Sequence, residues 1–248
     1  MQYQQKKKLE WLLVDYFKEV YTDFPKGRLT ENESPDFLLT VNNKFTIGIE
    51  LTRLYPESGK AFSQNEQEQV GTRIQLIDTA RNYFEKKSTL KCFVKFLFSS
   101  DINPEPERVL SRSVKISGII SEGVKGFNPD SFNMAAIIKG LPPGIEVILV
   151  LYRPGMEYSV WEPANNLGIS ANLLDDIKFS IRKKDDKLKL YRKQQLNEYW
   201  LLITTDKLRQ KKAVNVDNLM LNVEFESQFK KVFIMELVTG NVLCLSDS

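Results

Sequence analysis

The sequence predicts a protein of the α/β or α+β class, with a mixed central sheet flanked by helices. Long amphipathic segments with helical spacing, such as 5–22 and 64–86, alternate with short apolar runs rich in β-branched and aromatic residues, such as 90–98 and 145–151. No internal repeat or low-complexity tract interrupts this alternation. Helices that alternate with buried strands are typical of a layered protein in which helices cover a sheet.

The expected elements follow in order from the same patterns. Residues 5–22 are expected to form a helix because apolar residues recur at the i, i+3, i+4, i+7 spacing: Leu9, Leu12, Leu13, Tyr16, Phe17 and Val20. Further helices are expected at 64–86, from 104 to about 124, and at about 172–192; strands are expected at 28–33, 36–41, 44–52, 90–98, 145–151, 158–161, 199–204, 232–237 and 242–245. We expect residues 1–100 to form a core and residues 101–248 an α+β remainder, packed on that core or completing the same domain.

The composition excludes several classes of catalytic and metal site. Histidine is absent from all 248 residues, and the two cysteines, Cys92 and Cys244, lie far apart in the sequence. A catalytic triad that depends on histidine, a histidine-ligated zinc or iron site and a Cys₄ site within one chain are therefore excluded. Any catalysis must use carboxylates, Lys, Tyr, Ser or Thr, or a metal held by oxygen atoms.

The sequence predicts a cytoplasmic protein without a membrane segment. Hydrophobic residues make up 42% and charged residues 27% of the chain, and no apolar run is long enough to span a bilayer. The polar start of the chain lacks the apolar stretch of a secretory signal. The two cysteines, in apolar strand-like surroundings, fit a reducing compartment.

A basic stretch near the C-terminal third indicates a polyanionic partner such as DNA. Residues 178–212 hold twelve basic and four acidic residues, while the net charge of the whole chain is +3. We expect four of these residues to bind nucleic acid: Arg182, Lys183, Lys184 and Lys187. A solvated helix face is the alternative interpretation of the same charges.

Residues 36–52 are expected to form a β-hairpin around Asn42-Asn43. A two-residue loop would mix polar with apolar faces, because a slip of one residue turns every side chain to the other face. A three-residue connection keeps the apolar faces together, with the pairs Val41–Phe45, Leu39–Ile47 and Phe37–Ile49. This register places Asp36 opposite Glu50.

Two carboxylates that lie opposite each other repel, so the pair of Asp36 and Glu50 needs an explanation. Either water separates the two groups at the surface, or they converge on a hard divalent cation such as Mg²⁺ or Mn²⁺. Gly48 lies on the same strand face as Glu50, and we expect it to leave room for a ligand or a backbone segment.

These residues carry a family resemblance. Pro35-Asp36 followed by Ile49-Glu50-Leu51-Thr52, with thirteen residues between the two acids, resembles the signature of the PD-(D/E)XK nuclease superfamily. The order helix, strand, strand, strand, helix, strand over residues 5–98 is similar to the core of that superfamily. The resemblance implies a restriction-endonuclease-like core with a C-terminal α+β extension, in a bacterial-type member with Glu-x-Thr in place of Glu-x-Lys.

The resemblance also implies the residues of a metal site. Asp36 and Glu50 would be metal ligands, and the backbone carbonyl of Leu51 would be a third. An acidic residue of the first helix often completes such a site; Glu10 is the position that we carry over, with Glu19 as its substitute.

Thr52 stands where the signature has lysine. A lysine there orients the attacking water and supports the developing negative charge, whereas a threonine hydroxyl can only hold a water by hydrogen bonding. A lysine from elsewhere could replace it. Lys95, a lone charge in the apolar run 92–98, is the first candidate for this catalytic role, and Lys184 and Lys187 are the second. A Lys95 that reaches solvent at a sheet edge is the alternative.

The expected function is that of a metal-dependent nuclease that hydrolyses phosphodiester bonds in DNA. Without histidine, activation of water falls to the bound Mg²⁺ or Mn²⁺. The alternative is a catalytically inactive module on the same fold that binds nucleic acid or protein, and a defence or toxin component with a protein partner is a third interpretation. The oligomeric state is open between a monomer and a homodimer.

Overall fold

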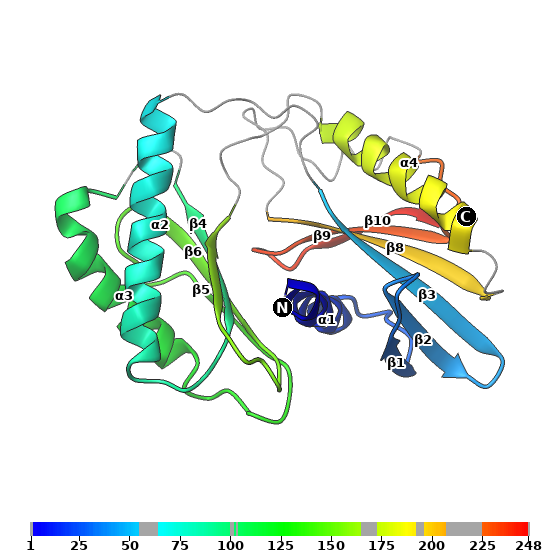
Figure 1. The fold of residues 1–248 in the computed structure, drawn as a ribbon, viewed down its shortest axis with the longest axis horizontal. Coiled ribbons are helices and arrows are strands. Elements are labelled where there is room, and N and C mark those ends of the chain that lie inside the picture. The colour runs from blue at the N-terminus through cyan, green and yellow to red at the C-terminus, as the bar shows by residue number, and fades with distance from the viewer. Residues whose placement is uncertain are drawn as a thin grey trace. The chain divides into compact units, whose positions relative to one another are not determined.

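A computed structural model of the chain describes residues 2–54, 64–99, 102, 104–164, 173–191, 196–206 and 225–247. The chain divides into two compact units that interleave along the sequence: residues 1–16 with 60–167, and residues 17–59 with 168–248. Each unit contains one sheet with both parallel and antiparallel neighbours, together with helices, so the prediction of an α+β protein with a mixed sheet is confirmed (Figure 1). None of the helices in the described ranges combines the length and apolarity needed to cross a bilayer.

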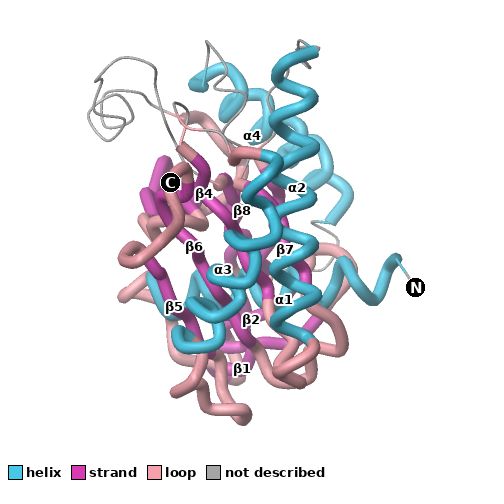
Figure 2. The backbone as a smooth tube through the Cα atoms, turned by 90° about the vertical axis from the view of Figure 1, so that its left-hand side faces the viewer, coloured by secondary structure: helices cyan, strands magenta, loops and turns pink. Residues whose placement is uncertain are grey.

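The first unit is built on a four-stranded sheet. Its strand order is β5 (Asn133–Ile137), β6 (Ile145–Tyr152), β4 (Phe93–Phe98) and β7 (Val160–Pro163), and only β4 and β7 are parallel neighbours. Two helices, α2 (Gln64–Glu85) and α3 (Val109–Gly123), lie side by side over one face of this sheet, and a 3₁₀ turn, η1 (Pro106–Arg108), leads into α3 (Figure 2).

The core of the first unit lies between these two helices and the sheet. Side chains of α2 and α3 pack in one cluster with alternate residues of β4 and β6: Ile77, Ala80, Phe84, Ile116, Ile120, Val94, Phe96, Ile148 and Val150. Because successive side chains of a strand point to opposite faces, Lys95 points away from this cluster. All six residues of β4 are buried, which agrees with the buried strand expected at 90–98.

The second unit is built on a six-stranded sheet. Its strand order is β1 (Arg28–Glu31), β2 (Phe37–Asn42), β3 (Phe45–Arg53), β8 (Glu198–Thr205), β9 (Lys231–Glu236) and β10 (Val242–Asp247). The three central strands, β3, β8 and β9, run parallel to one another, and the outer neighbours are antiparallel. Helix α1 (Gln2–Val20) begins in the first unit and ends in the second.

The two faces of the six-stranded sheet are covered by different elements. Helix α4 (Leu173–Tyr191) packs on one face, where its apolar side chains join those of β8 and β9: Ile177, Ile181, Leu188, Leu201, Ile203, Val232 and Ile234 (Figure 1). On the other face, Trp200 and Phe233 form an aromatic cluster with residues of the α1 end and the following turn: Phe17, Tyr21 and Phe24.

The order of elements expected for residues 5–98 is not formed within one sheet. Strand β4 belongs to the sheet of the first unit, and the strand that lies parallel to β3 is β8, which follows α4 in the sequence. A strand that is apolar on both faces can occupy a central position in either sheet, so its composition does not show which strands it pairs with. The expected division near residue 100 falls inside the first unit. Strand β5 was not expected from the sequence, because Asn-Met-Ala-Ala-Ile carries a weak strand pattern.

The register expected for the first hairpin is confirmed along its body. Phe37 pairs with Ile49 and Leu39 with Ile47. The connection differs from the expected one, because Asn42 rather than Val41 pairs with Phe45 and an irregularity lies between Thr40 and Asn42. The turn itself is tight, and the Asn42 side chain accepts a hydrogen bond of 2.9 Å from the Lys44 backbone N–H. The extra residue of this bulge, rather than a longer loop, keeps the apolar faces of the two strands on the same side.

The space beside Gly48 is filled by the protein itself, so the expectation that it leaves room for a ligand is wrong. A Cβ atom at this position would lie 2.6 Å from Cγ of Pro35, 2.8 Å from Cδ1 of Leu196 and 3.1 Å from Cδ1 of Tyr199. Glycine is needed here because three neighbouring side chains close over the strand.

We predict that Gly48→Ala destabilises the protein by about 1–3 kcal/mol, because a methyl group must displace closely packed neighbours. Gly118→Ala is the matched control: Gly118 lies in α3, and a Cβ there would meet nothing within 4 Å. The control should be neutral or stabilising by up to about 1 kcal/mol, as for glycine in an exposed helix. Thermal unfolding of the two variants checks this, and equal melting temperatures would contradict the packing argument.

The two cysteines are free, and we predict that they differ in reactivity. Cys92 is buried and Cys244 is exposed. Burial raises the pKa of the Cys92 thiol to about 12, so almost no thiolate exists at pH 8. A thiol reagent should therefore modify one cysteine in the native protein and both after denaturation, with peptide mapping to assign the site. Rapid native modification of Cys92 would contradict the prediction.

Candidate active site

Glu50 is a carboxylate on the apolar face of the sheet that α4 covers. The parallel register pairs Glu50 with Leu201, whose side chain belongs to the cluster beneath α4. Paired residues of neighbouring strands point to the same face, so Glu50 points toward α4. The residue is only 4% exposed. An ionised carboxylate in such a place requires a partner of opposite charge.

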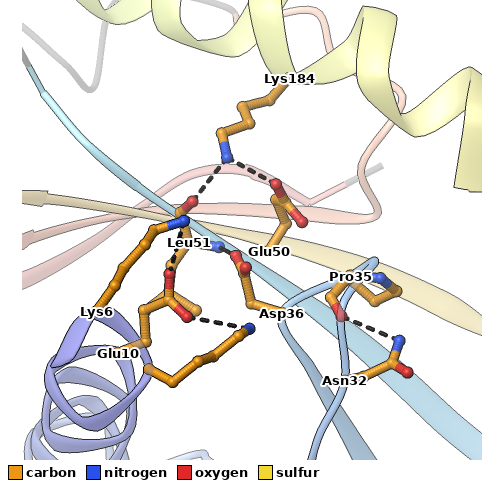
Figure 3. A network of polar contacts seen from close by, with 9 residues as sticks. Lys6, Glu10, Asn32, Pro35, Asp36, Glu50, Leu51 and Lys184 are labelled. Carbon is orange, nitrogen blue, oxygen red and sulfur yellow. Dashed lines mark hydrogen bonds and ion pairs between the residues drawn. The ribbon is translucent and has the colours of Figure 1, made fainter. Parts of the chain in front are cut away.

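Lys184 of α4 provides this partner. Its ammonium donates hydrogen bonds to Oε1 of Glu50 at 2.6 Å and to the backbone carbonyl of Leu51 at 2.7 Å (Figure 3). The exposed fractions of the two side chains are 13% for Lys184 and 5% for Glu50. The ion pair is therefore a buried contact that joins α4 to the middle of the sheet, and the expected third ligand, the Leu51 carbonyl, takes part in it.

Leu51 is available for this contact because β3 extends beyond the end of β2. If the pairing of the hairpin continued two residues beyond Phe37–Ile49, Pro35 would lie opposite Leu51. Proline has no backbone N–H, so it cannot donate a hydrogen bond to the Leu51 carbonyl. The N–H of Leu51 instead donates to Oδ2 of Asp36 at 2.8 Å. One backbone unit is thus held by the Asp36 carboxylate on its N–H and by the Lys184 ammonium on its carbonyl.

Asp36 lies beside Leu51, the residue that follows Glu50, because its Oδ2 accepts a hydrogen bond from the Leu51 N–H. The recorded pairing of the hairpin ends at Phe37–Ile49, one residue before the expected pair of Asp36 and Glu50, and Figure 3 draws both side chains close to Leu51. Asp36 is 8% exposed. Oε2 of Glu50 is buried and has no hydrogen-bond partner among the described residues. This oxygen is the part of the site whose bonding capacity is unused.

The residues of the site provide some, but not all, of the ligands that a small hard cation requires. No group of three or more Asp, Glu or Cys side chains that could hold a metal ion occurs in the described part of the chain. However, Mg²⁺ is commonly bound through one or two carboxylates and several waters, and the site offers two carboxylates and one carbonyl at the expected positions. The unpartnered Oε2 of Glu50 is a donor of the right chemistry. The ammonium of Lys184 already contacts two of the expected ligand atoms.

Glu10 and Thr52 are the other two site residues that the resemblance implies, and each has its own contacts. Glu10 belongs to the first unit, where its carboxylate lies 3.2 Å from the ammonium of Lys6 and 3.1 Å from that of Lys7. Thr52 is half-buried on the same strand face as Glu50, and its backbone carbonyl accepts a hydrogen bond of 3.4 Å from the Thr204 hydroxyl. Glu19, the substitute for Glu10, is exposed on the last turn of α1.

Lys95 is not a lone charge. The expectation that it was one is the reason why it is a candidate for the catalytic lysine. Its side chain is fully buried in the first unit and forms an ion pair with Glu162 of β7, the neighbouring strand. The ammonium also lies 5.7 Å from the centre of the Phe93 ring. The partner is 67 residues away in the sequence, so the local pattern gave no sign of it. The charge of Lys95 has a structural explanation.

The four basic residues expected to bind nucleic acid fall into two groups. Arg182, Lys183 and Lys187 are exposed on the outer surface of α4, whereas Lys184 points inward to Glu50. A sequence signal for this difference exists: the buried residues Ile177, Ile181 and Leu188 define the inner face of α4, and Lys184 falls on it at helical spacing. A lysine on the apolar face of a helix indicates a buried anion opposite.

Searches of known protein families, of curated proteins and of solved structures found no match to this chain. The site is therefore interpreted from its own geometry.

We predict that Lys184→Met lowers the free energy of unfolding by about 3–5 kcal/mol, because it leaves the Glu50 carboxylate buried without its partner. The double variant Lys184→Met/Glu50→Leu should recover much of this loss, since it removes both charges. Lys189→Met is the matched control, because Lys189 is an exposed lysine of the same helix that pairs with Asp186. Urea denaturation measures the free energy of unfolding of all three variants. Equal losses in Lys184→Met and Lys189→Met would show that the buried ion pair stabilises the protein no more than an exposed one.

Proposed function

We propose that the protein is a metal-dependent nuclease that hydrolyses phosphodiester bonds in DNA. The observation that carries the proposal is that Asp36 and Lys184 bond the backbone N–H and the carbonyl of Leu51, while the same Lys184 ammonium also bonds Glu50. A pair of acids beside a lysine is the combination that the PD-(D/E)XK signature describes. In this chain the lysine would come from α4, in place of Thr52.

The topology of the second unit also supports the proposal. Within residues 17–59 and 168–248, a three-stranded antiparallel meander is followed by α4 and by a strand parallel to β3. This is the order strand, strand with Asp, strand with Glu, helix, strand that the resemblance implies for a restriction-endonuclease-like core. In the proposed core, α4 and β8 would take the places expected for the helix at 64–86 and the strand at 90–98, and residues 60–167 would be an insertion.

The residues of the site would have separate roles. Asp36, Glu50 and the carbonyl of Leu51 would hold Mg²⁺ or Mn²⁺, which when bound lowers the pKa of a coordinated water and neutralises charge on the phosphate. The bond from the Leu51 N–H keeps the Asp36 carboxylate oriented. Oε2 of Glu50 would accept a hydrogen bond from the attacking water, and the Lys184 ammonium would support negative charge on the phosphate oxygens.

The exposed cations of α4 support DNA as the substrate. Arg182, Lys183 and Lys187 follow one another along the outer surface of the same helix that carries Lys184. Lysine and arginine at such positions contact phosphates and do not read base sequence. The proposal is accordingly a nuclease that follows the DNA backbone.

A second function is favoured by one feature of the same site. The Lys184 ammonium already balances the Glu50 charge and satisfies the Leu51 carbonyl, so the site is largely complete without a metal. With Thr52 at the signature position, the fold would then serve as an inactive module that binds nucleic acid or protein. Such a module would bind DNA in a salt-sensitive way without a divalent cation.

We predict that the protein cleaves DNA in the presence of Mg²⁺ or Mn²⁺ and that Asp36→Asn and Glu50→Gln each reduce the rate by at least about 100-fold, as expected for the loss of a metal ligand. Lys184→Met should reduce it by a similar factor. Cleavage is measured on supercoiled, linear and single-stranded DNA, with Lys95→Met as a control for a buried lysine outside the site.

The two functions differ in the outcome of this experiment. If the wild-type protein and Asp36→Asn/Glu50→Gln behave identically with both metals, the nuclease proposal fails. DNA binding that persists without metal and weakens in Lys183→Ala/Lys187→Ala would then favour the inactive module.

A further inference from the structure

The ammonium of Lys184 contacts two of the atoms through which a divalent cation would bind. These atoms are Oε1 of Glu50, at 2.6 Å, and the carbonyl oxygen of Leu51, at 2.7 Å. We propose that Lys184 is an exchangeable cation of the site: a divalent ion that enters displaces its ammonium from Glu50 and Leu51. The displaced ammonium then becomes available to an anionic group such as a substrate phosphate. This inference rests on the proposed metal binding of the site.

Simultaneous occupation by both cations is unfavourable for geometric reasons. Mg²⁺ binds oxygen ligands at about 2.0–2.1 Å, so an ion on either shared oxygen would lie within about 5 Å of an ammonium bound to the same atom. Like charges at this distance repel strongly in a site that is largely buried. Both residues of the ion pair are largely buried, so solvent screens this repulsion little. The two cations therefore compete for Glu50 and Leu51.

The surroundings of Lys184 allow its ammonium to leave without movement of the helix. The buried neighbours Ile181 and Leu188 fix the backbone of α4 on either side of Lys184. Asp185 adds a further anchor, since its carboxylate accepts hydrogen bonds from the Ser227 hydroxyl and the Gln228 N–H. A lysine side chain has a flexible four-carbon stem and three rotatable donors. The Lys184 side chain is 13% exposed, and in the proposed exchange rotation of its stem would move the charge away from Glu50.

The exchange has a consequence for the affinity of the site. Before a metal binds, the Lys184 ammonium prevents Glu50 from being a bare buried carboxylate, which would be costly. A metal must therefore replace an existing partner, and its observed affinity is lower than the two carboxylates alone would give. Removal of the ammonium should strengthen metal binding, whereas removal of an ordinary structural residue of the site would weaken it.

The first test is calorimetric titration of the protein with Mn²⁺ alone, without DNA. Lys184→Met is expected to bind Mn²⁺ on the order of tenfold more tightly than the wild-type chain, because one positive charge close to the ion is lost. Lys189→Met, which removes the same charge from an exposed position of α4, should bind as the wild-type chain does. An equal or lower affinity of Lys184→Met overturns the inference. If Mn²⁺ binds equally to all three proteins and the binding is lost in Glu50→Gln, only the inference fails; if no protein binds Mn²⁺, the metal site of the proposed function fails with it.

The second test uses the wild-type protein and so does not depend on the folding of a variant. An amine-reactive reagent is applied with and without saturating Mg²⁺, and modified lysines are quantified by mass spectrometry. Mg²⁺ should raise the modification of Lys184 several-fold and leave Lys189 unchanged. If Mg²⁺ protects Lys184, or leaves it unchanged while calorimetry shows that the ion binds, the ammonium is not displaced and the inference is wrong.

Discussion

The buried charge of Glu50 is the constraint on which the second unit depends. Its carboxylate lies on a sheet face whose buried cluster is largely apolar, beneath α4. A carboxylate in this position is tolerated only with a partner, and α4 can supply one only if its rotation turns Lys184 toward the strand. The ion pair and the buried apolar residues of α4 therefore favour the same rotation of the helix. Ile181 and Leu188 contribute apolar burial, and Lys184 adds a charged contact that requires Glu50 opposite it.

The same constraint links the hairpin to its chemistry through the backbone of one residue, Leu51. Because Pro35 has no N–H to donate, the carbonyl of Leu51 is open to a side chain, and the Leu51 N–H is also open because the Pro35 carbonyl accepts a hydrogen bond from the Asn32 side chain instead. Asp36 takes the N–H and Lys184 the carbonyl, so a carboxylate and an ammonium are held by the N–H and the carbonyl of the same residue. The proline next to the aspartate thus has a physical reason: it ends the strand pairing and leaves a carbonyl for a cation.

The sequence predicted the parts of this arrangement that depend on near neighbours. The alternation of Phe37, Leu39, Ile47 and Ile49 determines the hairpin register, because a slip of one residue would expose the apolar face. It could not predict that β8, about 150 residues further on, lies beside β3, since a buried apolar strand fits many positions. The same limit applies to the lysines: Lys95 appeared alone because its partner Glu162 is distant, and the role of Lys184 depends on how α4 packs.

The absence of histidine gives the lysine its importance. With no imidazole in the chain, the cations available to a buried carboxylate are ammonium, guanidinium and a bound metal. Guanidinium is rigid and strongly directional, whereas ammonium is a compact charge on a flexible stem and is easily moved. An ammonium on Glu50 can therefore act as a permanent counterion or as one that gives way to a metal. The two proposed functions differ in this respect: in the nuclease a divalent cation would replace Lys184 at Glu50 and Leu51, and in the binding module Lys184 would stay in place.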